Sequence, residues 1–339
     1  MITAGAPSAT MERVRVLRTL ALIIAILVGL AAGSALYVTQ PVYTAVRNLS
    51  TGGVVAPGKL EAHVRMLSVT LAPRDWQSAA NLDRVATYIG THLMKAGGRV
   101  SEQPYAVESG RARNVIASFG PQQGPRVVVG AHYDAAGPLP GADDNASGVA
   151  GLLELASLLG QTRTLGSRVD LVAFALEEPP YFGTKRMGSL VYAAALKREA
   201  AVVRAMISLE MIGYFSDAPN SQRFPHPALG LLYPSTGDFI AVVGRVGQGA
   251  LVRQVKKAMQ RTTYLDVYSF TGPQRTPGID SSDHASFWQQ GYRAVMITDT
   301  AYYRNDRYHT ARDTPDSLDY ARMAEVVRAV HRAVVVLAQ

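Results

Sequence analysis

The stretch R-V-V-V-G-A-H-Y-D, residues 126–134, decides the fold of this chain. Its first six residues are almost wholly apolar, which predicts a short buried strand, and its last three are polar or aromatic. A loop rich in Gly and Pro leads to G-A-D-D-N-A-S-G, residues 141–148, and an amphipathic helix is predicted over residues 147–159. The apolar run V-D-L-V-A-F-A-L, residues 169–176, then predicts a second buried strand. Buried strands joined through a helix indicate parallel pairing in a sheet that is covered on both faces.

The same alternation of elements continues on both sides of this stretch. The further predicted elements are helices over residues 75–96 and from residue 317 to the end, and strands over residues 113–119, 205–209 and 294–298. The expected fold is therefore α/β, with a mostly parallel mixed sheet that is flanked by helices on both faces.

The composition excludes several classes of protein. With 48% apolar and 18% charged residues among 339, the chain is expected to fold rather than to remain disordered. The 34 Lys and Arg exceed the 26 Asp and Glu by 8, which favours an anionic neighbour such as a membrane surface. The sequence contains no basic run with interleaved aromatic residues, so binding to nucleic acid is not indicated. The absence of Cys excludes disulfide scaffolds, thiol nucleophiles and Cys-ligated metal sites, so any metal is expected to be held by His, Asp and Glu.

The N-terminal residues predict a membrane anchor. Residues 1–18 are polar and carry three arginines, whereas the nineteen residues from Leu20 to Val38 carry no charge. At about 1.5 Å per residue, a helix of that length spans a hydrocarbon core of roughly 30 Å. Because the arginines come first, residues 1–18 are expected in the cytoplasm and residues 19–39 in the membrane as a signal anchor. The rest is expected outside the cytoplasm, in the periplasm or on the outer face of the cytoplasmic membrane.

A cleavable signal peptide is the alternative, since Gly33-Ser34-Ala35 is a suitable cleavage site and cleavage gives a secreted protein. Residues 40–60 are rich in Gly and Pro and predict a linker, and residues 61–339 are expected to form one domain. The sequence does not indicate an oligomeric state.

Residues that can bind metal ions follow the predicted buried strands. In chain order, these residues are His132, Asp134, Asp143, Asp144, Glu177, Glu178, Glu210 and His309. In such sheets functional groups gather beyond the carboxyl ends of the strands, so we expect these side chains to lie close together. Converging carboxylates repel one another unless cations lie between them. Two His with three Asp or Glu suit zinc, and manganese or cobalt also accept such ligands.

Six short motifs contain these residues. They are A-H-Y-D, G-A-D-D-N-A-S-G, A-L-E-E, L-E-M-I-G-Y, S-D-H-A-S-F and Y-H-T-A-R-D-T. In order and spacing, across about residues 113–320, they resemble the co-catalytic zinc exopeptidases of metallopeptidase family 28, which include bacterial and fungal aminopeptidases. The resemblance implies that residues 61–339 form a zinc peptidase catalytic domain, here in a membrane-anchored member of bacterial type.

The resemblance also implies which residues bind two zinc ions. Asp144 corresponds to the carboxylate that bridges both metals. His132 and Glu210 correspond to the remaining ligands of one metal, and Glu178 and His309 to those of the other. The family usually has Asp at the position of Glu210, and the longer side chain leaves open whether the second site fills.

Two further residues are implied to take part in catalysis. Glu177 corresponds to the general base, which takes a proton from the metal-bridging water and passes it to the leaving amine. Asp134 lies two residues from His132, on the same face of an extended segment, so it is expected to accept the imidazole N–H. Tyr308 is a candidate hydrogen-bond donor to the tetrahedral intermediate. Asp283 and His284 are expected to shape the pocket wall or to support the ligands.

Several other polar residues are interpreted as structural. Four histidines are interpreted as surface or packing residues, namely His63, His92, His226 and His331, and Glu154 is interpreted as a solvated residue. Asp143 is expected to bond loop backbone, and Asn145 or Ser147 is expected to cap a helix. Asp313 is expected in a turn or cap before the last helix.

The function that the sequence favours is an aminopeptidase that hydrolyses N-terminal residues of peptides. A carboxypeptidase or amidohydrolase on the same centre, a glutaminyl cyclase with a single zinc, and a catalytically silent binding domain remain alternatives. The side-chain preference is not indicated, because the aromatic residues of loops 213–237 and 262–282 either line a pocket or pack those loops. These residues are Tyr214, Phe215, Tyr264 and Tyr268.

Overall fold

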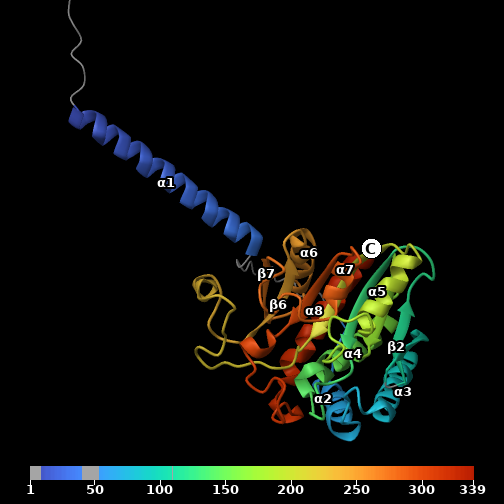
Figure 1. Ribbon diagram of the computed structural model, residues 1–339. Helices are drawn as coiled ribbons and strands as arrows, with labels where there is room; N and C mark the ends of the chain where they lie inside the picture. Colours follow the sequence, from blue (N-terminus) through green and yellow to red (C-terminus); the bar gives the residue numbers. More distant parts are fainter. Residues whose placement is uncertain (1–8, 40–52, 109) are drawn as a thin grey trace, which may run out of the picture.

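A central sheet of eight strands organises the C-terminal domain (Figure 1). The computed structural model describes residues 9–39 and 53–339, apart from residue 109. In spatial order the strands are β1 (Arg99–Val107), β2 (Gly110–Phe119), β4 (Arg168–Phe174), β3 (Arg126–His132), β5 (Val203–Glu210), β8 (Ala294–Thr298), β6 (Phe239–Arg245) and β7 (Asp266–Gly272). The four central strands β4, β3, β5 and β8 run parallel. The β1–β2 hairpin joins β4 antiparallel, and the parallel pair β6–β7 runs opposite to β8. The predicted mixed α/β sheet is confirmed.

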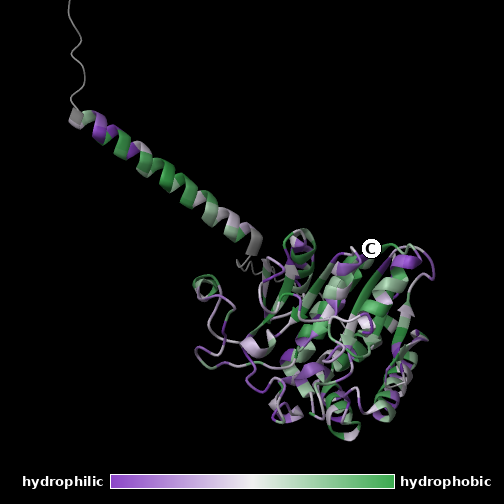
Figure 2. Ribbon diagram, in the orientation of Figure 1, coloured by the Kyte–Doolittle hydropathy of each residue, from purple (hydrophilic) through white to green (hydrophobic). Residues whose placement is uncertain are grey.

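Alternate residues of the strands other than β1 enter two different cores. In β3, Val127 and Val129 pack with the helices on one face of the sheet, whereas Val128 packs on the other. The first face is covered by α2 (Pro57–Arg65), α3 (Ala79–Lys95), α4 (Gly148–Gly160), α6 (Gly249–Met259) and α8 (Tyr320–Ala338). The second face is covered by α5 (Gly188–Arg198) and α7 (His284–Gln289). Hydrophobic residues accordingly fill the strands and the inner sides of the helices (Figure 2).

Helix α4 is buried around nearly its whole circumference, although its sequence predicts an amphipathic helix. It contacts the sheet, α2, α3 and α8, so few of its side chains reach solvent. The interpretation of Glu154 as a solvated residue is wrong for the same reason. Glu154 is only 5% exposed, and its Oε1 lies 3.5 Å from Nε2 of His63 on α2.

Some element boundaries also differ from the predictions. The helix expected from Asp75 begins at Ala79, after a turn in which the Ser78 N–H donates to the Asp75 carbonyl. The strands β1, β6 and β7 are absent from the predicted set. Most of the expected linker, residues 40–52, lies outside the described residues, and α2 already begins at Pro57.

Helix α1 (Ala9–Thr39) projects away from the domain (Figure 1). Its segment Thr10–Tyr37 is long and apolar enough to cross a membrane, and none of it is buried within the chain. A cleavable signal sequence passes the same test, so membrane anchoring stays a prediction.

Candidate metal centre

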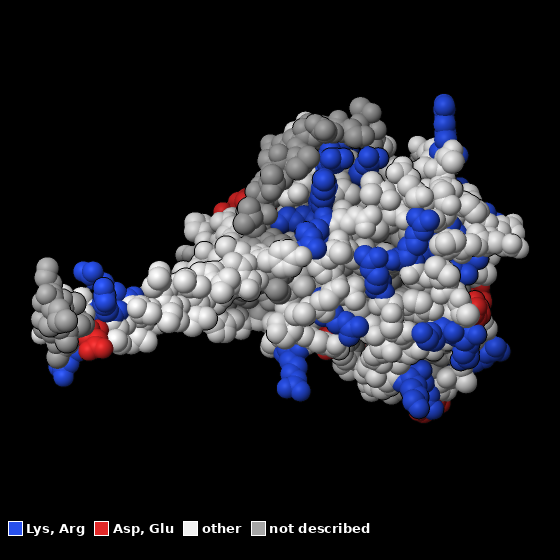
Figure 3. Space-filling model, turned by 90° about the horizontal axis from the view of Figure 1, so that it is seen from above, with Lys and Arg blue, Asp and Glu red and all other residues white. Residues whose placement is uncertain are grey.

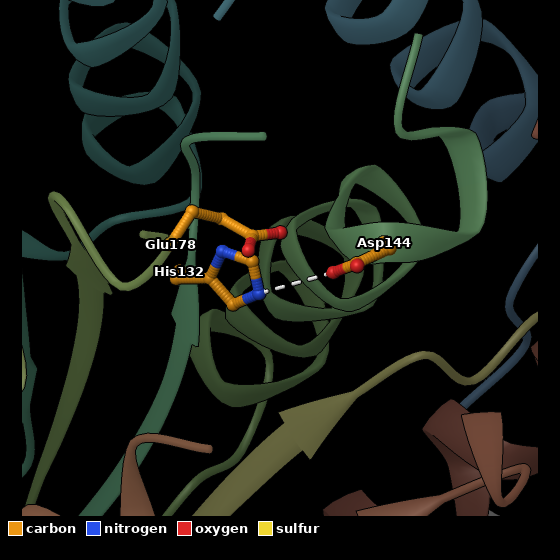
Figure 4. Close-up of side chains that lie close together, drawn as sticks. All are labelled: His132, Asp144 and Glu178. Atoms are coloured by element: carbon orange, nitrogen blue, oxygen red, sulfur yellow. Dashed lines mark ion pairs between the residues drawn. The ribbon is translucent and has the colours of Figure 1, made fainter. Parts of the chain in front are cut away.

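The five residues predicted to bind metal come together at one end of the parallel strands. His132 is the last residue of β3, Glu210 is the last residue of β5, and Glu178 follows β4. Asp144 lies in the loop between β3 and α4, and His309 lies in the loop between β8 and α8. The ligand atoms of His132, Asp144 and Glu178 lie within 4.8 Å of one another, and all three residues are buried (Figure 4).

Asp144 lies between the two histidines. Its Oδ1 is 3.3 Å from Nε2 of His132, and its Oδ2 is 3.0 Å from Nε2 of His309. Oε2 of Glu210 lies 3.5 Å from the first imidazole nitrogen, and Oε1 of Glu178 lies 3.2 Å from the second. The cluster therefore divides into two sets of three residues that share the Asp144 carboxylate. These are the two sets that the resemblance implies for a pair of metals.

The electrostatics of the cluster suit divalent cations. Burial and the charge of Asp144 raise the pKa of Glu178 to about 7, and burial raises the pKa of Glu210 as well. Burial opposes a proton on His309, but its contacts with Asp144 and Glu178 raise its pKa to about 10. Burial also opposes the charge of Asp144, yet contacts with His132 and His309 lower its pKa. Three carboxylates and two imidazoles thus form a donor set whose net negative charge divalent cations would balance.

Asp134 holds the segment that carries the two glutamates. Its Oδ1 accepts the Glu177 N–H at 3.0 Å, and its Oδ2 accepts the Glu178 N–H at the same distance. Its Oδ1 also lies 3.4 Å from Nδ1 of His132, in close contact but without the hydrogen bond that the sequence predicts. Oε2 of Glu177 lies 4.0 Å from Nε2 of His132, and burial raises the pKa of Glu177 well above its usual value. One carboxylate therefore positions a histidine and both glutamates.

The loop that carries Asp144 is held by Arg74, which sequence reasoning did not single out. This arginine is 1% exposed and donates to three carbonyl oxygens, at 3.0 Å to Tyr133, 2.9 Å to Pro140 and 2.8 Å to Gly141. Gly141 has a φ of +57°, and a Cβ there would collide with the Asp144 carbonyl oxygen, so only glycine fits. Nothing in the sequence around Arg74 indicates this role, because its partners lie about sixty residues further along the chain.

A second support of the same loop is Asp313. Asp313 lies in a turn, as the sequence suggests, because its N–H donates to the Thr310 carbonyl. Its carboxylate in addition accepts the N–H groups of Asp143 and Asp144, at 2.9 and 3.1 Å. Asp143 bonds loop backbone as predicted, since its Oδ1 accepts the Gly213 N–H at 3.1 Å. Its Oδ2 also accepts the side-chain N–H of Asn305 at 2.9 Å. The Asp144 loop is thus tied to the loops that follow β5 and β8.

Asn145 connects the start of α4 to the end of β5. Its Oδ1 accepts the N–H groups of Gly148 and Met211, both at 3.1 Å, and its Nδ2 donates to the Leu209 carbonyl at 2.9 Å. Of the two candidate caps, Asn145 and Ser147, Asn145 is the one whose side chain accepts an N–H group from the first turn of α4. The side chain of Ser147 does not cap the helix.

Left-handed backbone conformations occur at three non-glycine residues beside the cluster. Leu176 precedes Glu177 and has a φ of +59°, Met211 follows Glu210 and has a φ of +50°, and His309 itself has a φ of +55°. Each such residue costs on the order of 1–3 kcal/mol, and such strain is concentrated at functional sites. The buried hydrogen bonds of this region offset that cost.

The residues predicted to surround the metals lie in different environments. The ring of Tyr308 stacks on His309 with ring centres 3.8 Å apart. Asp283 is fully buried, and burial raises its pKa to about 7. His284 is fully buried, its Nε2 donates to the Ile279 carbonyl at 2.7 Å, and burial lowers its pKa to about 4.

An apolar pocket of about 110 Å³ opens beside the cluster, and Glu210 and Tyr308 form part of its wall. The remaining wall is mainly aromatic and aliphatic and includes Phe224, Tyr233, Phe239, Tyr268, Phe270 and Met296. Of the aromatic residues whose role the sequence left open, Tyr268 lines this pocket, whereas Tyr264 is 62% exposed. The volume of this pocket is comparable to that of apolar cavities of about 150 Å³ that hold benzene.

Comparison with known proteins places this site in a family. The model of peptidase family M28 matches residues 114–334. Uncharacterized protein YfbL of Escherichia coli (strain K12) is 49% identical over 289 residues, which cover 83% of this chain and 88% of that protein. Leucine aminopeptidase 1 of Ajellomyces capsulatus (strain G186AR) is 27% identical over 223 residues, 62% of this chain. That alignment spans only 52% of the fungal protein, about half of its length.

Solved structures share the fold. The LapA aminopeptidase of Legionella pneumophila superposes with a TM-score of 0.65 at 18% identity, covering 84% of this chain and 72% of that one. A glutaminyl cyclase of Porphyromonas gingivalis gives a TM-score of 0.62 at 21% identity, covering 83% and 98%. The family model spans well over half of the chain, and a relative of near 50% identity matches most of it, so the chain belongs to peptidase family M28 and is a metallo-exopeptidase.

Proposed function

We propose that this protein is a zinc-dependent aminopeptidase that removes apolar residues from the N-termini of peptides. The pocket beside the cluster is the observation that carries the proposal. A first residue whose side chain fills this pocket would have its carbonyl group next to Glu210 and within reach of Glu177. A lining of aromatic and aliphatic side chains favours Leu or Phe over a charged residue. The leucine aminopeptidase relatives support the same substrate class.

The cluster would hold two zinc ions, or manganese or cobalt, with Asp144 shared between them. Zinc bound there would polarise the scissile carbonyl and lower the pKa of a water. Glu177 would accept the proton of the attacking water on its carboxylate and deliver it to the leaving amine. Burial raises the pKa of Glu177, which makes its carboxylate a stronger base for the proton of the water. Asp134 would keep Glu177 in place through the backbone hydrogen bond described above.

The test uses the full-length chain purified in detergent and chromogenic amides of single amino acids. Leu and Phe amides should be hydrolysed much faster than Lys or Glu amides, and a chelator should stop turnover until zinc is restored. Glu177→Gln should lower kcat by about 10²–10⁴-fold with zinc content unchanged. The matched variant Glu199→Gln, at an exposed glutamate, should keep the wild-type rate. Wild-type turnover by Glu177→Gln would contradict the general-base assignment, and a preference for charged residues would contradict the role of the pocket.

The alternative reactions are separated by their products. A glutaminyl cyclase should convert peptides with N-terminal Gln to pyroglutamyl peptides and hold one zinc per chain, whereas the proposed enzyme holds two. A carboxypeptidase should release C-terminal residues from peptides whose N-terminus is acetylated. The proposed aminopeptidase should leave such blocked peptides intact.

We further propose that α1 is retained as a membrane anchor, with residues 1–18 in the cytoplasm and the catalytic domain outside it. The uncharged run from Leu20 to Val38 and the three arginines that precede it support this orientation. Protease added outside intact spheroplasts should digest the domain and leave α1 with the membrane. A mature N-terminus near residue 35 would instead identify a cleaved signal peptide.

A further inference from the structure

A row of arginines lies at the end of the sheet opposite the metal centre. The strands β3, β4, β5 and β8 run parallel, so all four begin on this side of the sheet. The strand pairing also places the first residue of β1 and the last residue of β6 on this side. One arginine lies at this end of six different elements. We call this row the arginine edge, and in sheet order it consists of Arg99, Arg168, Arg126, Arg204, Arg293 and Arg245.

Little negative charge balances the arginine edge. Arg126 and Arg168 share one buried carboxylate, that of Asp170, at 3.2 and 2.6 Å. Within the part of the chain that the structure describes, the other four members form no ion pair with a carboxylate. Two further exposed basic residues are Arg163, in the connection that enters β4, and Arg198, the last residue of α5. The exposed Glu199 directly follows Arg198. Viewed from above, this end of the domain displays many Lys and Arg and few Asp or Glu (Figure 3).

Two exposed valines lie among these charges. Val202 directly precedes β5 and is 62% exposed, and Val246 directly follows β6 and is 57% exposed. A surface that combines many arginines with isolated apolar side chains suits a layer of anionic headgroups over acyl chains.

Helix α1 reaches the domain at this same end (Figure 1). The guanidinium of Arg253, in the first half of α6, lies 5.1 Å from the ring centre of Tyr37 near the end of α1, and α1 also contacts β7. A bilayer that contains α1 would therefore lie nearer to the arginine edge than to the metal centre.

We propose that the arginine edge docks on the anionic phospholipid headgroups of the membrane that holds α1, an inference that rests on the proposed anchoring. Each basic residue near such a surface favours the docked state by about fivefold. Docking sets the orientation of the domain. The seven residues of β3, at about 3.3 Å each, keep His132 roughly 20 Å further from the lipid than Arg126. The active centre would then face away from the membrane.

The experiment uses the full-length chain in vesicles, with a fluorophore on one introduced cysteine, since the chain has none of its own. Val202→Cys reports from the arginine edge, and Ala218→Cys reports from the exposed loop after β5 at the opposite end. Vesicles contain phosphatidylcholine alone or with phosphatidylglycerol, and a quencher is attached to the lipid headgroups. The label at residue 202 should be quenched strongly only in the anionic vesicles, the label at residue 218 in neither, and added salt should reverse the quenching.

A charge variant and its matched control complete the test. Replacing Arg163, Arg198 and Arg293 with Gln should reduce the docked-to-undocked ratio by about two orders of magnitude, at about fivefold per residue. Replacing three exposed basic residues elsewhere removes the same net charge and should change little; these are Arg84, Arg111 and Lys185. Both variants should keep wild-type peptidase activity in detergent.

Three results would overturn the proposal. Equal quenching at residues 202 and 218 would indicate adhesion without orientation, and equal effects of the two triple variants would exclude a specific edge. A label at residue 202 that responds to double-stranded DNA but not to anionic vesicles would indicate a nucleic-acid surface instead. Flotation of the chain with neutral vesicles tests the anchor separately, so loss of anchoring and loss of docking are distinguishable, and neither depends on the peptidase assay.

Discussion

The most demanding prediction concerns Arg74→Met, which removes three donors from the Asp144 loop while keeping a similar volume. Hydrogen bonds to a charged group are worth about 1.5–3 kcal/mol each, so three of them contribute roughly 5–9 kcal/mol. Burial opposes the charge and lowers the Arg74 pKa from 12.5 to about 10, which corresponds to about 3 kcal/mol. The difference predicts a loss of about 4 kcal/mol in the free energy of unfolding.

For a domain of this size, such a loss lowers Tm by about 8 °C, at roughly 2 °C per kcal/mol. The assay is thermal unfolding of the full-length chain in detergent, with and without zinc. Arg74→Lys keeps the charge but fewer bonds and should lose about half as much. Arg84→Met removes an exposed arginine and should stay within about 0.5 kcal/mol of the wild type. Zinc should also raise the Tm of Arg74→Met less than that of the wild type, because the Asp144 loop is less firmly held.

A Tm of Arg74→Met within about 2 °C of the wild type would refute this reasoning, since the three bonds would then contribute no more than surface contacts. An equal loss in Arg84→Met would refute it as well, because the effect would not be specific to the buried arginine.

Three further predictions follow from the buried groups. Burial lowers the pKa of His284 to about 4, so as pH falls below 6.5 the unfolded chain takes up this proton before the folded chain does. His284→Gln should therefore remove about 3 kcal/mol of the stability loss between pH 6.5 and 4, measured by denaturation at a series of pH values. Asp313→Asn should weaken zinc binding about 10–100-fold in chelator competition, and unchanged affinity would dismiss its support of the Asp144 loop. Ala241→Leu narrows the apolar pocket and should lower kcat/KM for Leu amides about 10–200-fold relative to Ala amides, whereas an equal change for both would exclude this pocket as the specificity site.

The strands that carry the metal centre are those that the sequence predicts best. The strands β3, β4, β5 and β8 are short apolar runs, because both of their faces are buried, and residues with distinctive chemistry follow them. The edge strand β1 escapes prediction, since its residues are largely exposed and include Pro104. The strand β6 is a continuous apolar run, which periodicity alone does not distinguish from a buried helix segment.

The same contrast applies to the site itself. His132, Asp144 and Glu178 belong to motifs whose residue types are typical metal ligands. Arg74 belongs to none of the six motifs, and Asp313 lies in one of them, but the role of each depends on backbone groups that are distant in the sequence. Arg is rarely buried, so a sequence-based interpretation assigns it to the surface by default. The supporting residues are thus visible only once the tertiary contacts are known.

The reversal of β6 and β7 relative to their neighbours has a consequence for how this enzyme can diversify. The metal centre is built where β3 and β5 end, whereas the strand residues on β6 and β7 that line the apolar pocket belong to a pair that runs the other way. Under the proposed function, the groups that perform hydrolysis lie at the ends of β3, β4 and β5, whereas most strand residues of the side-chain pocket lie on β6 and β7, with Glu210 and Met296 at the boundary. Mutations in the β6–β7 half can change which peptides are accepted while the groups that perform hydrolysis stay as they are.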